Sequence, residues 1–255
     1  MRLAIATLEF NNGYWVILSA VMLVLIIFFR YLFFSSLYHW FFLKFCKKLL
    51  QKRIILVKPL QKKQLLKEIY WSFISGCIFG IVGMVLYYLW FVNYTLIYTD
   101  LHLYSVWYVP LSVCVFLLLQ DTYYYWIHRW MHKPKIYRYF HVIHHKSIHT
   151  NVFTSFSFHP YETILQALFL PLVFMVLPMH IYALLIVLSI MTISATINHA
   201  GIEIYPSGKF GKWFKKWIIG ATHHDAHHTK FNYNYGLYFT FWDRIMHTEL
   251  EDNKK

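Results

Sequence analysis

Long apolar stretches alternate with short basic segments along this chain. Residues 14–40, 69–92 and 104–127 are mostly apolar, with Arg30 in the first and Asp121 in the third as their only charges. Each is long enough to cross a bilayer, since a helical span needs about 20 residues. The pattern predicts an all-α integral membrane protein with about three long spans.

A fourth apolar stretch, residues 163–199, is too long for one straight helix. Pro178 interrupts it, and proline removes a backbone donor and clashes with the preceding helical turn. We therefore predict a hairpin of two helices, about 163–177 and 180–199. The remaining polar segments carry most of the histidines, and we expect them to form a cap on one side of the membrane.

The composition agrees with this pattern. Hydrophobic residues make up 58% of the chain and charged residues 14%, whereas soluble proteins carry about 25% charge. These values exclude a water-soluble globule and a disordered chain. The three cysteines, Cys46, Cys77 and Cys114, form no CxxC pair, so neither a disulfide framework nor a thiolate zinc site is expected. The first apolar run is too long for the core of a signal peptide.

Basic residues set the expected orientation. The chain has 24 Lys and Arg against 11 Asp and Glu, and residues 44–67 alone contain nine of the basic ones and no acid. Residues 128–160 and 201–255 hold most of the others, so the positive-inside rule places all three segments in the cytoplasm. Because these charges flank the spans, we interpret them as topology signals attracted to anionic headgroups and expect no nucleic-acid partner.

The candidate chemistry lies in three histidine blocks within the basic segments. They read His128-Arg-Trp-Met-His132, His141-Val-Ile-His144-His145 and His224-Asp-Ala-His227-His228, and His199 follows the hairpin. Spacings of three and four residues bring side chains to one helical face, where imidazoles can share a metal. Nine histidines exceed the four ligands of one tetrahedral zinc, so the blocks predict a two-metal centre.

Several other functions are excluded or disfavoured. The chain has no HExxH zinc-protease motif, no Walker loop and no GxGxxG motif. A histidine-rich metal transporter stays an alternative, although it would be expected to place ligands within the spans. A zinc-dependent membrane hydrolase is a further alternative, and it would work without oxygen or a reductant.

The three blocks, followed by FNYNYGLYFTFWDRIMHT, resemble the fatty acid hydroxylase and sterol desaturase superfamily of membrane-bound non-haem di-iron oxidases. The resemblance covers roughly residues 110–250. The segment Phe156-Ser-Phe-His-Pro160 is similar to the sterol C5-desaturase branch, whereas HHDxHH is more similar to the C4-methyl oxidase branch. The branch, the lipid and the choice between hydroxylation and desaturation stay open.

The resemblance implies a ligand set, cofactors and partners. Two irons would use dioxygen as co-substrate to oxidise a C–H bond of a bilayer lipid, such as a sterol, sphingoid or fatty acyl chain. Electrons would come from an external donor of the b5, ferredoxin or reductase type. The implied metal ligands are all histidines: His128, His132, His141, His144, His145, His199, His224, His227 and His228.

Acidic residues near these blocks are candidates for supporting roles. Asp121 is an acid inside an apolar span, and we predict that it orients a ligand histidine from another segment. Asp225 is a candidate for a similar role, and Glu203 for a further ligand. Asp243 and Arg244 are interpreted as a structural pair.

We expect two parts in the chain: an N-terminal transmembrane region with a basic loop (residues 1–100) and a hydroxylase-like region with the histidine blocks (residues 101–255). The compact chain favours a bacterial inner membrane over the endoplasmic reticulum. The active site is expected on the cytoplasmic side.

Overall fold

The structure is a computed structural model that describes residues 12–56 and 60–250. Lys58, Lys254 and Lys255 of the predicted basic segments therefore lie outside the described residues, as does the start of the chain compared above with signal peptides.

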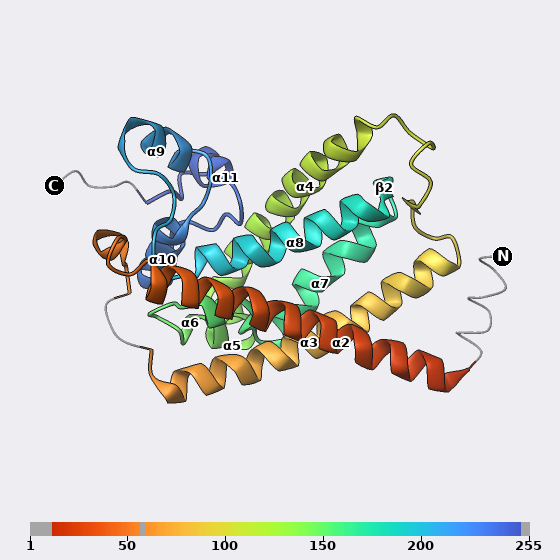
Figure 1. Cartoon of the computed structure of the whole chain (residues 1–255), viewed down its shortest axis with the longest axis horizontal. Helices are drawn as coiled ribbons and strands as arrows, with labels where there is room; N and C mark the ends of the chain where they lie inside the picture. Colours follow the sequence, from red (N-terminus) through yellow and green to blue (C-terminus); the bar gives the residue numbers. More distant parts are fainter. Residues whose placement is uncertain (1–11, 57–59, 251–255) are drawn as a thin grey trace.

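The described chain is almost entirely helical (Figure 1). Its elements are α2 (Gly13–Tyr38), η1 (His39–Phe45), η2 (Gln51–Arg53), α3 (Lys62–Phe91), β1 (Ile97–Tyr98), α4 (Tyr108–Met131), α5 (Pro134–Phe140), α6 (Val142–His145), η3 (Val152–Phe156), α7 (Pro160–Phe174), β2 (Met179–His180), α8 (Ile181–Asn198), α9 (Gly208–Lys215), α10 (Ala221–Lys230) and α11 (Phe241–Ile245).

Three helical segments of the described chain are long and apolar enough to cross a membrane: Gly13–Phe45, Lys62–Phe91 and Ile181–Asn198. The predicted all-α membrane architecture is confirmed, but the third such helix is α8, one arm of the predicted hairpin. Helix α4 was expected in that place. It has 24 residues, but its second half carries the polar side chains of the site, which lower its hydropathy.

The predicted break between the two helices of the hairpin is confirmed. Helix α7 ends at Phe174 and α8 begins at Ile181, so Pro178 lies in the turn between them. Strand β2 in this turn pairs in parallel with β1, which ties the end of the hairpin to the segment after α3. Beneath this end, apolar side chains of α3, α4, α7 and α8 form the main core, with Phe116 and Phe174 fully buried.

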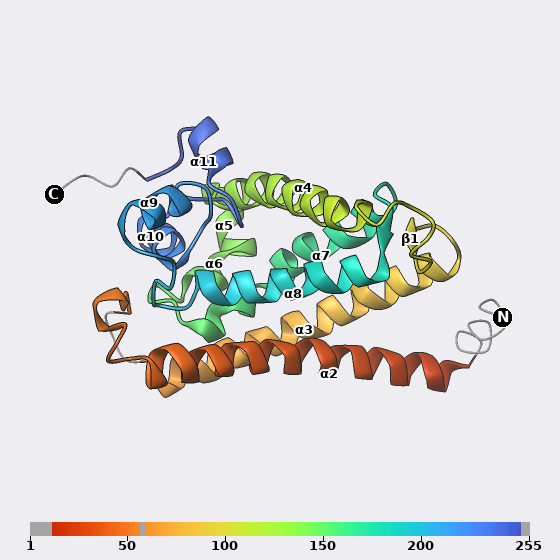
Figure 2. The same cartoon turned by 45° about the horizontal axis from the view of Figure 1, so that its top comes forward.

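Helices α2 and α3 lie side by side along one face of the molecule (Figure 2). Small residues permit this close contact: Phe28 lies opposite Gly76, and a Cβ atom added to Gly80 would clash with the side chain of Val24. Close packing over a small-xxx-small pattern is a common way for membrane helices to associate.

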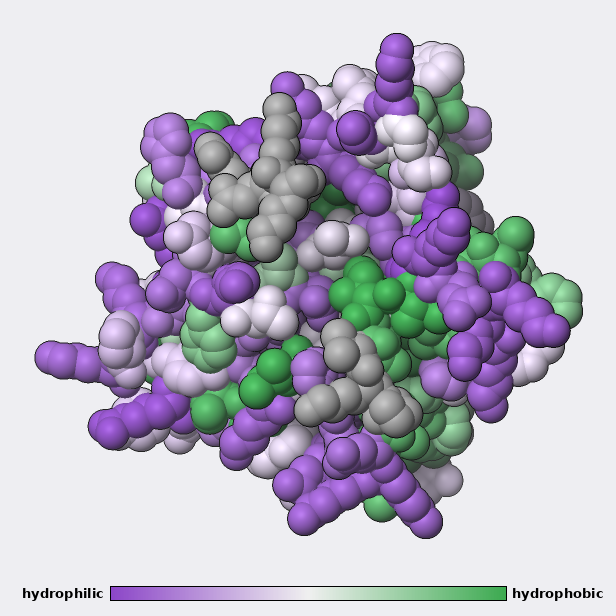
Figure 3. All heavy atoms as spheres, turned by 90° about the vertical axis from the view of Figure 1, so that its left-hand side faces the viewer, coloured by the Kyte–Doolittle hydropathy of each residue, from purple (hydrophilic) through white to green (hydrophobic). Residues whose placement is uncertain are grey.

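Helices α6 and α10, which carry five of the site histidines, lie at one end of the bundle, and β1 and β2 lie at the other (Figure 1). The η1 segment, with the start of the basic loop, is at the histidine-rich end. Seen from this end, the surface is mostly hydrophilic (Figure 3). The basic segments and the histidine blocks therefore share one end, as the charge pattern predicts.

Candidate metal centre

The nine predicted histidines come together from five parts of the chain. They are supplied by α4 and its C-cap, the turn before α6, α6 itself, the C-cap of α8, and α10. Each is buried, with at most 9% of its surface exposed. Helical spacing explains part of this arrangement, because His224, His227 and His228 of α10 are buried while Asp225 between them is partly exposed.

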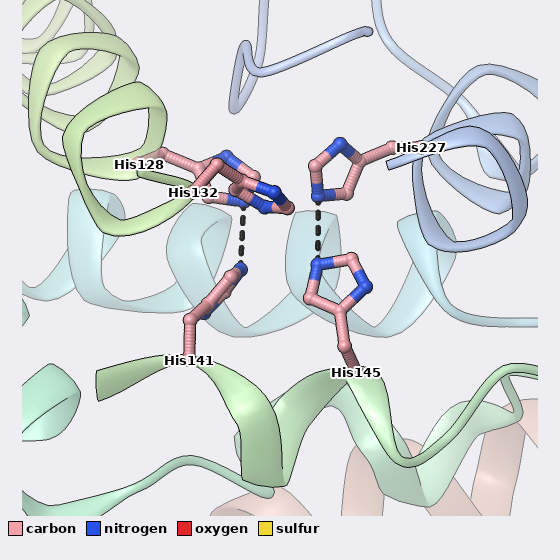
Figure 4. Close-up of side chains that lie close together, drawn as sticks. All are labelled: His128, His132, His141, His145 and His227. Atoms are coloured by element: carbon pink, nitrogen blue, oxygen red, sulfur yellow. Dashed lines mark hydrogen bonds between the residues drawn. The ribbon is translucent and has the colours of Figure 1, made fainter. Parts of the chain in front are cut away.

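The histidines form two groups. The five-histidine group consists of His128, His132, His141, His145 and His227, and one ring nitrogen from each lies within 4.8 Å of the others. Figure 4 shows their rings converging from α4, α6 and α10. The four-histidine group consists of His144, His199, His224 and His228, and meets the same limit.

The hydrogen bonds of the rings indicate which nitrogens are available to bind a metal. In the four-histidine group, Nδ1 of His199 donates to the Ala195 carbonyl at 2.8 Å and Nδ1 of His144 to the Ser157 carbonyl at 3.3 Å. Neutral rings protonated at Nδ1 carry a lone pair at Nε2, yet the two Nε2 atoms lie 3.2 Å apart. Two facing lone pairs repel unless a cation lies between them.

The five-histidine group has the same geometry. The Nε2 atoms of His128 and His141 are 2.9 Å apart, and those of His145 and His227 are 3.0 Å apart (Figure 4). Two nitrogens bound at about 2.1 Å to one ion and at right angles to each other would be about 3.0 Å apart. Both ring nitrogens of His132 are buried without a hydrogen-bond partner, so a metal would satisfy one of them.

Burial keeps these rings neutral. It lowers the pKa of His227 to about 4, although the hydrogen bond from His227 to the Tyr233 carbonyl opposes this shift. Burial also lowers the pKa of His224 well below its usual value, and the neighbouring histidines add to the effect. A neutral imidazole is the form that binds a metal.

A short C-terminal loop orients two histidines of the five-histidine group. The Tyr235 carbonyl accepts from Nδ1 of His128 at 2.8 Å, and the Tyr233 carbonyl accepts from Nδ1 of His227 at 2.7 Å. Such outer partners fix the tautomer and the direction of a ligand. Residues 233–239 therefore act as a backbone support for this group, and we call them the support loop.

Two buried carboxylates hold the support loop. Oδ1 of Asp121 accepts from the backbone N–H groups of Leu237, Tyr238 and Phe239, at 2.7 to 3.1 Å. Asp243 accepts from the N–H groups of Tyr235 and Gly236. The prediction that Asp121 orients a ligand histidine by contacting it is therefore wrong. Three backbone donors converge on its carboxylate, so its effect on the histidines passes through the loop.

The acid that does meet a ligand histidine is Glu162, which the sequence analysis missed. Its Oε2 atom lies 2.9 Å from Nδ1 of His141, and both side chains are fully buried. The signal was present, because Glu162 is an isolated acid at the start of an apolar stretch, just after Pro160. The predicted apolar stretch begins at residue 163, so Glu162 lies just outside it.

The other predicted acids stay outside both groups. Glu203 accepts from the backbone N–H groups of Tyr205 and Thr222, so it is not among the converging ligands. Asp225 is partly exposed and interacts with His149 and Thr150. The prediction that Asp243 and Arg244 form a pair is also wrong, because Nε of Arg244 lies 2.7 Å from Oε2 of Glu249.

A cavity adjoins the four-histidine group. His199 and His224 line it together with apolar side chains from α3, α4, α7 and α8, including Phe79, Phe169 and Met191. No residue of the five-histidine group is among its lining residues within the described chain. The two groups therefore differ in their access to a ligand.

Comparison with known proteins agrees with the geometry. The fatty acid hydroxylase model matches residues 113–248, slightly more than half of the chain. The chain belongs to the fatty acid hydroxylase family. The matched region contains all nine histidines together with Asp121, Glu162 and Asp243, whereas α2 and α3 lie before it. The predicted division at residue 100 stays a prediction.

Individual family members with sterol-related names are also similar. Lathosterol oxidase of Rattus norvegicus is 34% identical over 189 residues, which cover 72% of this chain and 60% of that protein. Human lathosterol oxidase is 33% identical over the same shares, and a Delta(7)-sterol 5(6)-desaturase of Gibberella zeae is 32% identical over 71% of this chain and 55% of its own. The chain thus spans about 60% or less of these relatives. No solved structure matches.

Proposed function

We propose that this chain is a membrane di-iron oxidoreductase that hydroxylates or desaturates a lipid, with a sterol as the first candidate substrate. The observation that carries the proposal is the pair of buried, neutral histidine groups beside an apolar cavity. The sterol follows from the names of the relatives, lathosterol oxidase and Delta(7)-sterol 5(6)-desaturase.

Iron suits the ligand set better than zinc. Five histidines in one group exceed the four ligands of a tetrahedral zinc site, and nitrogens about 3 Å apart fit near-right-angle coordination. Bound iron would supply the chemistry that activates dioxygen and oxidises an unactivated C–H bond. Desaturation balances when the lipid loses two hydrogens, an external donor adds two electrons, and dioxygen with two protons becomes two waters.

Residues of the chain orient the histidine rings for metal binding and shield the site from water. The support loop holds the rings of His128 and His227 with Nδ1 protonated, which leaves their Nε2 atoms free to bind metal. Glu162 lies 2.9 Å from Nδ1 of His141 and supports that ring from the side away from the metal. Tyr124 packs between the cavity and the five-histidine group, with its ring centroid 5.0 Å from that of His128. The apolar cavity wall excludes water from the side on which the lipid would lie.

The arrangement also bears on orientation and partners. Because the basic segments share an end with the histidine groups, we infer that this end faces the cytoplasm. A soluble or membrane-bound electron donor would then act from that side. The choice between a bacterial inner membrane and the endoplasmic reticulum stays a prediction.

Metal content and product formation test the proposal together. We expect purified wild-type protein to hold about two irons per chain and the double variant His144→Ala, His227→Ala to hold none, since each group loses a ligand. With a Δ7 sterol, ferrous iron and a reductase system, a product should form under oxygen and be absent under argon. Product formation without oxygen, or one zinc retained by the double variant, would contradict the proposal.

A transporter is the second candidate that the test addresses. The histidines lie together at one end of the bundle, beyond the middle of the long helices, which disfavours a transmembrane metal path. Metal uptake into proteoliposomes, lost in the double variant, would favour transport instead.

A further inference from the structure

The cavity beside the four-histidine group contains polar groups that the described residues leave unsatisfied. Asn198 lines it immediately before His199, and its Nδ2 atom donates to the Leu237 carbonyl at 3.0 Å. That bond fixes the amide, because the reverse orientation would bring two oxygens together. The Oδ1 atom is consequently an acceptor that is buried without a partner.

Gln120 presents the opposite group to the same cavity. Its Oε1 atom accepts from the hydroxyl of Tyr238 at 2.7 Å. Within residues 12–56 and 60–250, its Nε2 atom has no acceptor. Tyr124 follows one helical turn later on α4, and its hydroxyl likewise has no hydrogen-bond partner in the described chain.

The support loop brings these groups together. Asn198 binds the carbonyl of Leu237, and Gln120 binds the side chain of Tyr238, the next residue. Leu237 and Tyr238 line the cavity too. An unpaired acceptor from α8 and an unpaired donor from α4 therefore flank one short segment. Ser155 and Gln166 also line the cavity, but they donate to the Val152 carbonyl and to Glu162.

This pattern fits one kind of ligand group. A hydroxyl donates one hydrogen bond and accepts others, so it would satisfy Oδ1 of Asn198 and Nε2 of Gln120 together. A ketone or ether has no hydrogen to give and would leave the asparagine acceptor unpaired, which costs free energy in a buried site. No Lys or Arg is among the described residues that line the cavity, so no cationic side chain there would pair with a carboxylate or phosphate.

We propose that Asn198 and Gln120 form a subsite for the hydroxyl group of a lipid alcohol, assisted by Tyr124. The inference rests on the proposed lipid oxidation and adds to it the class of substrate and the direction in which the substrate lies. The lipid lies with its hydroxyl toward the histidines, because Asn198 directly precedes His199. The apolar remainder of the lipid packs against the cavity wall formed by α3, α7 and α8.

Binding of matched lipids tests the subsite without turnover. Full-length iron-loaded protein in nanodiscs is titrated under argon with a tritiated Δ7 sterol and with the methyl ether of the same sterol. The same comparison is made with hexadecanol and its methyl ether, so that a sterol is distinguished from a straight-chain alcohol. We expect the alcohol to bind about tenfold or more tightly than the ether in at least one pair, since the ether leaves a buried acceptor unpaired.

Three variants and a matched control assign the preference to residues. Asn198→Leu and Gln120→Leu should bring the ratio of the two dissociation constants close to one, and Tyr124→Phe should lower it two- to threefold. The control is Tyr123→Phe: Tyr123 also lines the cavity, but its hydroxyl already donates to the Leu165 carbonyl at 2.7 Å. Its loss should leave the alcohol preference at the wild-type ratio.

Each outcome decides for or against the subsite. Equal binding of alcohol and ether in both pairs, no saturable binding of any of them, or a preference that survives in Asn198→Leu and Gln120→Leu would overturn it. If Asn198→Leu fails to fold, Tyr124→Phe and Gln120→Leu carry the same test. An oxygen-dependent product without alcohol preference would reject the subsite alone, whereas an alcohol preference without such a product would reject the oxidase.

Discussion

The two histidine groups are supported in different ways. In the five-histidine group, the outer partners of His128, His141 and His227 come from the support loop and α7. In the four-histidine group, His144 donates to the Ser157 carbonyl and His199 donates to the turn of its own helix. In each group two further rings have no Nδ1 partner within the described chain: His132 and His145 in the first group, and His224 and His228 in the second. Three rings of the first group, but one of the second, therefore have a partner from another segment.

The two histidine groups also differ in their access to the cavity. Among the described residues, the four-histidine group lines the cavity, through His199 and His224, and the five-histidine group does not. A buried group held from outside can keep its geometry while the lipid changes, whereas a group at the cavity has to tolerate different occupants. The comparison therefore suggests one metal position that stays closed and one that meets the substrate.

Removing one ligand from each group is the strongest test of this comparison. His141→Ala and His228→Ala should each lower the metal content from about two ions per chain to about one, and each should reduce activity at least about 100-fold. Metal analysis of the purified variants measures the loss. If either substitution removes both ions, the groups are one cooperative site and the comparison fails.

The next largest effect is expected at Glu162. Glu162→Gln weakens the support of His141, and loss of such an outer partner lowers metal affinity about 10- to 100-fold. The loss should be confined to the ion of the five-histidine group, as a competition titration with a chelator would show.

Glu68→Gln is the matched control for Glu162→Gln. Glu68 is also a buried carboxylate, but it accepts from Ser147, Asn151 and Thr154 and contacts no histidine. Its substitution should lower thermal stability and leave both metal affinities near the wild-type values. Equal metal loss in the two variants would show that burial matters here and the histidine contact does not.

Asp121→Asn tests the support loop at a distance. The amide replaces a carboxylate that receives three backbone N–H groups, so we expect a loss of about 1–3 kcal/mol in the free energy of unfolding. Because the loop holds His128 and His227, the five-histidine group should also bind its metal more weakly, by a smaller factor than in Glu162→Gln. Denaturation and chelator titration separate the two effects. Unchanged metal binding in a destabilised variant would limit Asp121 to a structural role.

The last prediction concerns the effect of pH on the metal-free protein. Burial lowers the pKa of His227 to about 4, whereas its ordinary value is 6.5. Between these values the unfolded chain binds a proton that the folded chain excludes, so stability falls as the pH drops from about 6.5 to about 4. The loss is on the order of 3 kcal/mol for this group.

Melting temperatures from pH 7.5 to 4.5, with and without iron, measure this dependence. Bound metal competes with protons for the same nitrogens, so the loaded protein should hold its stability to a lower pH. A metal-free protein whose stability is constant down to pH 4.5 would contradict the buried, neutral state of these rings.

Local patterns in the sequence predicted much of the fold and of the ligand set. Apolar length predicted α2 and α3, and Pro178 predicted the break between α7 and α8, because both signals act over a single helix or turn. The histidine spacing predicted ligands from one helical face, and basic residues predicted that the three blocks share an end. These features depend on helix period, proline geometry and charge, which can be read along a chain.

Only the tertiary structure decided which distant groups meet. Asp121 and Glu162 are both lone acids in apolar surroundings, and nothing local shows that the first receives three backbone N–H groups and the second a histidine. The division of nine similar histidines into groups of five and four is equally invisible along the chain. Side-chain partners in a helical bundle are set by helix packing and by the path of the support loop, which link residues more than 100 positions apart.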